Sequence, residues 1–154
     1  MVVWALCNTG GKSNSVYKEN ADFWNNIENY VQDRISSKKE ERLFNSCCQI
    51  MWAYGNNKPL SAKTVSLIID VIFDKESSKV LEEDMFVFEL TTMTSFFSSI
   101  KTSLPSSLVE YLENISIKYF GILIQDMNYI EVMKMLKYTI YDEKNQIKQD
   151  KLPI

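Results

Sequence analysis

Apolar side chains recur at intervals of three and four residues along most of the chain. This spacing places them on one face of an α-helix, and polar turn residues separate one such segment from the next. The pattern predicts six or seven helices and an all-α fold. The main segments run from about 23–36, 40–54, 61–74, 82–100, 106–124 and 126–141. The segment 61–74 is rich in β-branched residues, so a strand remains open there.

Residues that favour helix ends stand at several of these predicted boundaries. Asp22, Ser61 and Asp126 can each accept hydrogen bonds from the unpaired N–H groups at a helix start. Gly55 and the asparagines after it can close a helix, because these residues tolerate the left-handed conformation. Pro105 suits the first turn of the helix that follows it.

The chain also contains an internal repeat with an offset of 44 residues. When the sequence is aligned with itself at this offset, Phe44 aligns with Phe88 and Trp52 with Phe96. In the second helices, Ile68 aligns with Leu112. A helix pair cannot bury its apolar face alone, so such units stack on their neighbours. The repeat predicts an antiparallel helix-pair array, an α-solenoid of about three units. Because amphipathic bundles also give partial matches, a compact helical bundle around 106–124 is the alternative.

Two Trp-Ala pairs, Trp4-Ala5 and Trp52-Ala53, each stand late in the first helix of a unit. Each is followed by a polar turn and a second amphipathic helix. In this respect the chain resembles the octotricopeptide, FAST-kinase-like and heptatricopeptide group of helical repeats. The resemblance implies an α-solenoid that binds RNA and protein in an organellar ribonucleoprotein, such as the mitochondrial ribosome. It also implies a mitochondrial location. Because the chain shows no Arg-rich presequence, a cytoplasmic location is the alternative.

Basic and amide side chains occupy comparable turns after the first helices. Lysine side chains there can contact phosphates, and asparagine side chains can form hydrogen bonds with bases. Ordinary solvated turn residues are the plainer interpretation. The candidate RNA-binding residues are Lys12, Asn56, Asn57, Lys58 and Lys101.

A second group of residues is a candidate for contact with a protein partner. Trp24 neighbours Phe23 on one helix, so one of the two must face outward, and we expect Trp24 to do so. Lys134 and Lys137 are three residues apart and can form a basic helix face, although a solvated face is the plainer interpretation.

The composition excludes several kinds of catalytic and metal site. The chain of 154 residues has no histidine, which removes Ser-His and Cys-His nucleophiles and histidine metal sites. Its three cysteines, Cys7, Cys47 and Cys48, form no CxxC pair, so we expect reduced thiols in a reducing compartment. No phosphate-binding glycine motif occurs. We therefore predict a protein that is not an enzyme, with no cofactor, no metal and no small-molecule substrate.

The net charge of −3 argues against a strongly basic nucleic-acid binder acting alone. The resemblance implies RNA and neighbouring proteins as partners in a large assembly. No apolar run is long enough for a membrane span. The predicted organisation is a single helical-repeat domain over 1–141 and a mobile charged tail over 142–154. The alternative function is a compact helical module that binds only proteins, as viral Bcl-2-like host-defence antagonists do.

Overall fold

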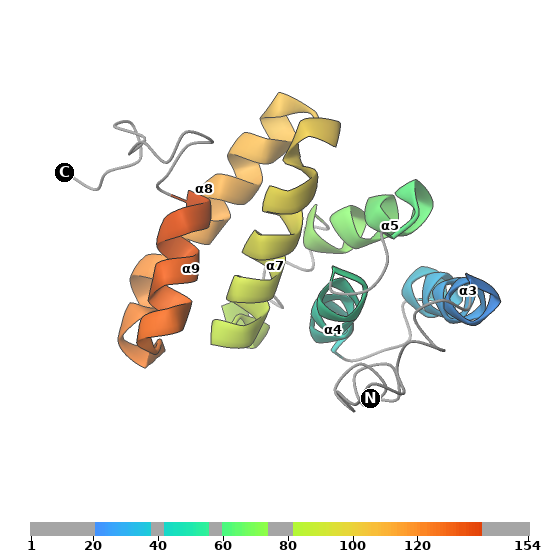
Figure 1. Ribbon diagram of the computed structural model, residues 1–154, viewed down its shortest axis with the longest axis horizontal. Helices are drawn as coiled ribbons and strands as arrows, with labels where there is room; N and C mark the ends of the chain where they lie inside the picture. The colour runs from blue at the N-terminus through green and yellow to red at the C-terminus, as the bar shows by residue number, and fades with distance from the viewer. Residues whose placement is uncertain (1–20, 38–41, 56–59, 74–81, 140–154) are drawn as a thin grey trace. The chain divides into compact units, whose positions relative to one another are not determined.

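The computed structural model describes residues 21–37, 42–55, 60–73 and 82–139 (Figure 1). Every regular element in these ranges is a helix, which confirms the all-α class and removes the strand alternative for 61–74. The chain divides into two compact units, Met1–Asp84 and Met85–Ile154. The predicted repeat domain, 1–141, therefore contains a division that the sequence pattern did not indicate. The predicted tail lies outside the described residues.

Unit 1 contains three described helices, α3 (Ala21–Ser37), α4 (Leu43–Gly55) and α5 (Ala62–Phe73), and α5 packs against both of the others. The apolar face of α4 is buried as the periodicity predicts, whereas α3 buries Glu28 and Gln32 beside its apolar residues and leaves Tyr30 exposed. Cys47 and Cys48 are reduced thiols without exposed surface in the middle of α4. One cluster joins α3 to the end of α4 and consists of Trp24, Ala53 and Tyr54.

The start of α5 has a cap that is completed by another helix. Ser61 Oγ accepts a hydrogen bond from the Thr64 N–H at 3.3 Å, which confirms the predicted cap. In a capping box, a carboxylate at the third helical residue accepts a hydrogen bond from the backbone N–H of the cap residue. Here Glu28 of α3 supplies it, accepting from the Ser61 N–H at 2.7 Å and from the Thr64 hydroxyl at 2.5 Å. Gln32 Nε2 donates to Thr64 Oγ1 at 2.9 Å, so four polar groups hold α3 against α5.

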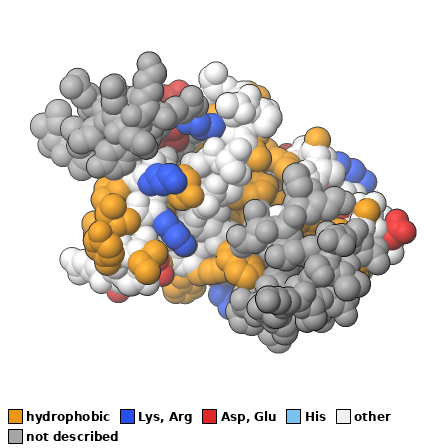
Figure 2. Space-filling view, in the orientation of Figure 1, with side chains coloured by type: hydrophobic (Ala, Val, Ile, Leu, Met, Phe, Trp, Pro, Cys, Tyr) orange, Lys and Arg blue, Asp and Glu red, His pale blue; other side chains and the backbone are white. Residues whose placement is uncertain are grey.

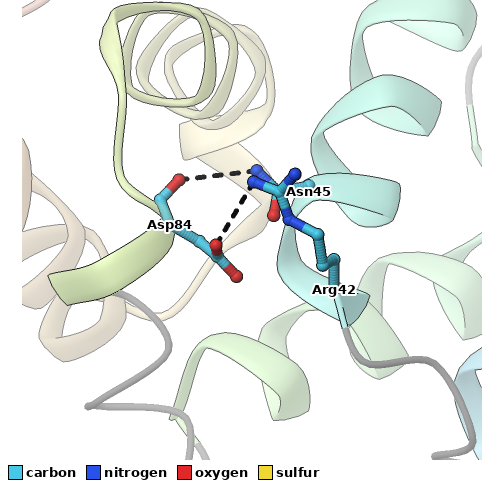
Figure 3. Close-up of polar contacts among 3 residues, drawn as sticks. All are labelled: Arg42, Asn45 and Asp84. Atoms are coloured by element: carbon cyan, nitrogen blue, oxygen red, sulfur yellow. Dashed lines mark hydrogen bonds and ion pairs between the residues drawn. The ribbon is translucent and has the colours of Figure 1, made fainter.

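Residues 82–84 are helical and are tied to the start of α4 (Figure 3). Asn45 Nδ2 donates to the Asp84 backbone carbonyl at 3.5 Å, and Arg42 Nη2 donates to Asp84 Oδ1 at 3.4 Å. The Arg42 side chain is 64% exposed and that of Asp84 only 16%. This partly solvated ion pair therefore contributes little to stability. The hydrogen bond to the backbone carbonyl fixes where Asp84 lies relative to α4.

Unit 2 contains α7 (Val87–Ile100), α8 (Ser106–Leu123) and α9 (Tyr129–Thr139), which lie side by side (Figure 1). Two short 3-10 helices, η2 (Lys101–Ser103) and η3 (Ile124–Asp126), join them. Within this unit α7 packs against both α8 and α9 and buries seven residues, whereas the longer α8 buries four. The expected central helix, 106–124, is therefore wrong for this unit, because α7 occupies that position.

The predicted helix 82–100 is interrupted at Met85 and Phe86. Phe86 has an extended backbone with φ −109° and ψ 177°, and α7 begins only after it. Met85 is 4% exposed, so its side chain is buried at the interruption. Periodicity alone did not indicate this break, because the apolar spacing continues across it.

Two predicted N-caps are wrong. Asp22 lies within the first turn of α3, and Asp126 lies in η3. The cap of α9 is Asn128, whose Oδ1 accepts from the Glu131 N–H at 3.0 Å, while Glu131 Oε2 accepts from the Asn128 N–H at 2.8 Å. Asn128 rather than Asp126 caps α9, because Glu131 stands three residues after Asn128 and its carboxylate accepts from the Asn128 N–H. Tyr129, three residues after Asp126, has no carboxylate for this role.

The positions at which the helices begin repeat at the predicted offset. Helices α4 and α7 begin at residues 43 and 87, and α5 and α8 begin at 62 and 106, so both pairs are 44 residues apart. Individual residues correspond less well, since Phe44 is 1% exposed and Phe88 is 37% exposed. The buried positions Phe44, Cys47, Cys48 and Met51 correspond better to Glu89, Thr92, Met93 and Phe96, one residue further along. The solenoid arrangement stays a prediction.

Candidate functional site

The candidate RNA-binding residues are only partly within the described ranges. Lys12, Asn56, Asn57 and Lys58 lie outside them. Lys101 is described: it follows the last residue of α7, opens η2 and is half-buried. Its backbone carbonyl accepts from the Leu104 N–H at 3.2 Å, which fixes the turn between α7 and α8. A lysine at this point also lies favourably near the negative end of the α7 dipole.

Trp24 does not face outward, so its assignment as a partner contact is wrong. Its side chain is 2% exposed and its ring meets that of Tyr54 edge to face, with centroids 5.1 Å apart. Phe23 is the partly exposed member of the adjacent pair and contacts the same cluster from the side. Trp24 is buried because α4 presents Tyr54 and Ala53 to it, a contact that α3's own sequence does not reveal.

Lys134 and Lys137 are exposed on α9, as expected of a basic helix face. Lys137 Nζ lies 5.8 Å from the centroid of the neighbouring Tyr138 ring. Apolar residues around the turn between α8 and α9 are exposed as well: Ile122, Ile124, Tyr129, Ile130 and Met133, from 43% to 77%. Figure 2 shows hydrophobic side chains gathered over this edge of unit 2 with basic side chains beside them. We call these five apolar residues with the two lysines the α9 surface.

No helix in the described ranges combines the length and the apolar character that crossing a membrane requires. In the same ranges no three acidic or cysteine side chains gather as metal ligands would.

A pocket lies within unit 2 between the three helices and the turn at η2. Its empty space is about 390 Å³, part of which is open to solvent. Apolar side chains make much of its wall: Met93, Phe97, Leu104, Val109 and Leu112. Of these, Met93 and Leu112 are buried at 0% and 4% exposure. The pocket is therefore lined by the same residues that form the core of the unit.

The pocket also carries hydroxyl groups and two charges. The hydroxyl groups come from all three helices: Thr94, Ser98, Ser116, Tyr138 and Thr139. Thr94 Oγ1 donates to Ser116 Oγ at 3.0 Å across the α7–α8 contact, and both residues are buried. Thr139 Oγ1 donates to the Met135 carbonyl at 2.6 Å. The charged lining residues are Lys101 and Glu113.

Of the predicted site residues that the structure describes, Lys101 alone lines this pocket. Glu113, Ser116 and Tyr138 were missed because no motif singles them out. The available signal was weaker: Thr94 and Ser116 are small hydroxyl residues that stand on otherwise apolar helix stripes. Such residues are compatible with core packing when their hydroxyl groups are paired, either with a carbonyl of their own helix or with a group of a neighbouring helix.

Comparison with known proteins gives no match for this chain, whether against family models, curated proteins or solved structures.

Proposed function

We propose that this protein is a non-enzymatic helical-repeat component of an organellar ribonucleoprotein, in which it binds RNA and neighbouring proteins together. The observation that carries the proposal is the common offset of 44 residues between the starts of both helix pairs. A repeated helix pair is the unit from which extended binding surfaces are built. The resemblance to organellar helical repeats implies that RNA is the partner of such a surface.

The Trp-Ala motif of the first helix supports this interpretation. Ala53 has no exposed surface and lies in one cluster with Trp24 and Tyr54. Trp52 is half-buried and packs against the same cluster from outside. A small residue at 53 lets the end of α4 approach α3 closely, so the motif serves helix packing in the way that a repeat signature does.

Lys101 supports the RNA side of the proposal. It occupies the turn after the first helix of the α7–α8 pair, the place that Lys58 occupies in the preceding unit by sequence. Lysines repeated at equivalent turns would contact successive phosphates of one strand.

A second candidate function is a helical module that binds only proteins. The α9 surface favours it, since Tyr129 is 77% exposed and Ile130 is 64% exposed. A patch of exposed apolar residues is typical of a protein contact site. With Lys134 and Lys137 beside them, this surface fits an acidic partner by charge complementarity.

Native sedimentation of the tagged protein from its source cells, with and without RNase, separates the two functions. We expect migration with a large particle that RNase reduces in size. Lys101→Gln should weaken this association, and Lys118→Gln, an exposed lysine of α8, serves as the matched control. Migration as a small species that is indifferent to RNase would overturn the proposal and leave the protein-binding module. Imaging of the tagged chain tests the mitochondrial location in the same cells.

A further inference from the structure

The α9 surface lies wholly within unit 2 and exposes several large apolar residues together. Met135 and Thr139 turn one side of α9 towards the core of the unit, with 0% and 1% exposure. The opposite side carries Ile130, Met133 and Lys137, at steps of four and three residues along the helix. Ile130 is 64% exposed and Met133 is 46% exposed. A helix that is apolar on two sides is typical of one that is covered on both.

The place of α9 in the repeat indicates that a helix covers its outer side. Helix α9 begins at residue 129, 42 residues after α7 begins at 87, and at this offset the buried Met135 corresponds to the buried Met93. The next residue of α7, Thr94, forms a hydrogen bond with Ser116, so α8 covers that side of α7. The equivalent side of α9 is the one that carries Met133. In the described ranges no helix follows α9, and there this side stays open.

We propose that the α9 surface binds the α9 surface of a second copy of this chain, with the two α9 helices antiparallel about a two-fold axis. Such an axis brings the same surface of both copies together, so the surface must be complementary to itself. The distribution of charge along α9 meets this requirement. The proposal concerns self-association and does not depend on RNA binding.

The two ends of α9 carry charges of opposite sign. Asp126 is exposed in η3, just before α9 begins, and Lys137 is exposed in the last turn of α9. The other acid of the helix, Glu131, accepts from the Asn128 N–H within the same helix. An antiparallel pair places the start of each helix beside the end of the other, so Asp126 of each copy lies near Lys137 of the second copy. A parallel pair would instead bring like charges together, which is unfavourable.

One register of the antiparallel pair serves the apolar and the charged contacts together. The two-fold axis that places Ile130 opposite Met133 of the second copy passes between residues 131 and 132, because both residues are equally far from it. The same axis brings η3, with Asp126, beside the last turn of the second copy, with Lys137. Two exposed apolar side chains of each copy are thereby removed from water, which favours association.

Sedimentation equilibrium of the purified full chain over a range of concentrations tests the proposal. Ile130→Glu places a charge in the centre of the contact. Tyr30→Glu on α3 is its matched control, since Tyr30 is 62% exposed and Ile130 is 64% exposed. Circular dichroism verifies the helix content of each variant.

Charge reversal tests the antiparallel arrangement itself. Asp126→Lys and Lys137→Glu are measured singly and as an equimolar mixture. In a dimer of either single variant both charged contacts pair like charges. In the mixed dimer both contacts pair opposite charges again. Lys63→Glu, at an exposed position of α5, is the control for a charge reversal elsewhere.

We expect a dimer with a roughly micromolar dissociation constant, because a contact of this small size belongs to the weak interfaces. Ile130→Glu should raise the dissociation constant by more than about ten-fold. Each single charge reversal should raise it by roughly ten-fold, and the mixture should restore association. Added salt should weaken the parent dimer, because the charged contacts are exposed. Both controls should behave as the parent chain.

A parent chain that stays monomeric up to about 1 mM would overturn the proposal and leave the α9 surface to a different protein. A dimer that Ile130→Glu and Tyr30→Glu weaken equally would overturn the α9 surface as the contact. A mixture that associates as weakly as the single variants would overturn the antiparallel arrangement. The RNase experiment decides the proposed function separately from each of these outcomes.

Discussion

The Tyr54 hydroxyl donates a hydrogen bond of 2.7 Å to the backbone carbonyl of Trp24, thirty residues earlier in the chain, while their rings meet edge to face. This contact joins the end of α4 to the start of α3. It combines a buried polar bond with aromatic packing, and both residues are almost without exposed surface. The pair therefore joins α4 to α3, the first described helix of unit 1, in addition to the contacts between α3 and α5.

The contribution of the Tyr54 hydroxyl can be separated from that of its ring. Tyr54→Phe should lower the free energy of unfolding by about 1 kcal/mol, because it removes one buried hydrogen bond. Tyr54→Ala should lower it by about 3–5 kcal/mol through loss of the ring contacts. Urea unfolding followed by tryptophan fluorescence measures both. Tyr30→Phe is the control, since Tyr30 is 62% exposed and should be nearly neutral. Equal losses for Phe and Ala would contradict this division.

The cap of α5 should depend on the Thr64 hydroxyl. Thr64→Val removes a group that donates to Glu28 and accepts from Gln32, so buried polar atoms lose partners. We expect a loss of about 2–3 kcal/mol in unfolding free energy. Thr64→Ser keeps the hydroxyl and should retain most of the stability. Thr102→Val at an exposed position is the control. If Thr64→Ser proved as destabilising as Thr64→Val, the methyl group would be the important part.

The reciprocal cap at Asn128 should stabilise α9 locally. Asn128→Ala should cost about 1 kcal/mol, whereas Asn128→Ser should retain most of the cap. Amide hydrogen exchange in α9 gives the local measurement, and protection should fall most in the first turn. Gln125→Ala, at an exposed position before the turn, is the control. Unchanged protection in Asn128→Ala would show that packing against α7 and α8 holds this helix without the cap.

The Arg42–Asp84 pair should contribute little despite its long range in sequence. A double-mutant cycle with Arg42→Gln and Asp84→Asn should give a coupling free energy of at most about 1 kcal/mol. The reason is the 64% exposure of the Arg42 side chain, which leaves the charge largely solvated. The coupling should decrease further as salt is added. A coupling of several kcal/mol that salt does not change would contradict this expectation.

Local patterns account for the parts of the structure that depend on neighbouring residues. The three- and four-residue spacing predicts α3, α4, α5, α7, α8 and α9, because helix geometry repeats over a single turn. The cap at Ser61 was predictable, since the hydroxyl and the N–H it accepts from lie three residues apart. At Asn128 and Asp126 two local signals competed, and the reciprocal glutamate decided between them.

Features that join different helices could not be predicted in this way. The adjacent Phe23 and Trp24 are equally apolar, and only the approach of Tyr54 from α4 decides which of them is buried. Likewise, Glu28 caps α5 from another helix, and no residue spacing within α5 indicates it. The break at Phe86 follows no interruption of the apolar pattern.

The sequence by itself determined the all-α class, most helix boundaries, the helix-pair offset and the absence of histidine chemistry, because each follows from composition or from spacing within a few residues. The tertiary structure alone decided which aromatic faces the core, which helix is central in unit 2 and that Lys101, Glu113 and Ser116 line one pocket. These outcomes depend on side chains that are distant in sequence and that meet only when the helices pack, so the free energy that selects them is not a property of any one segment.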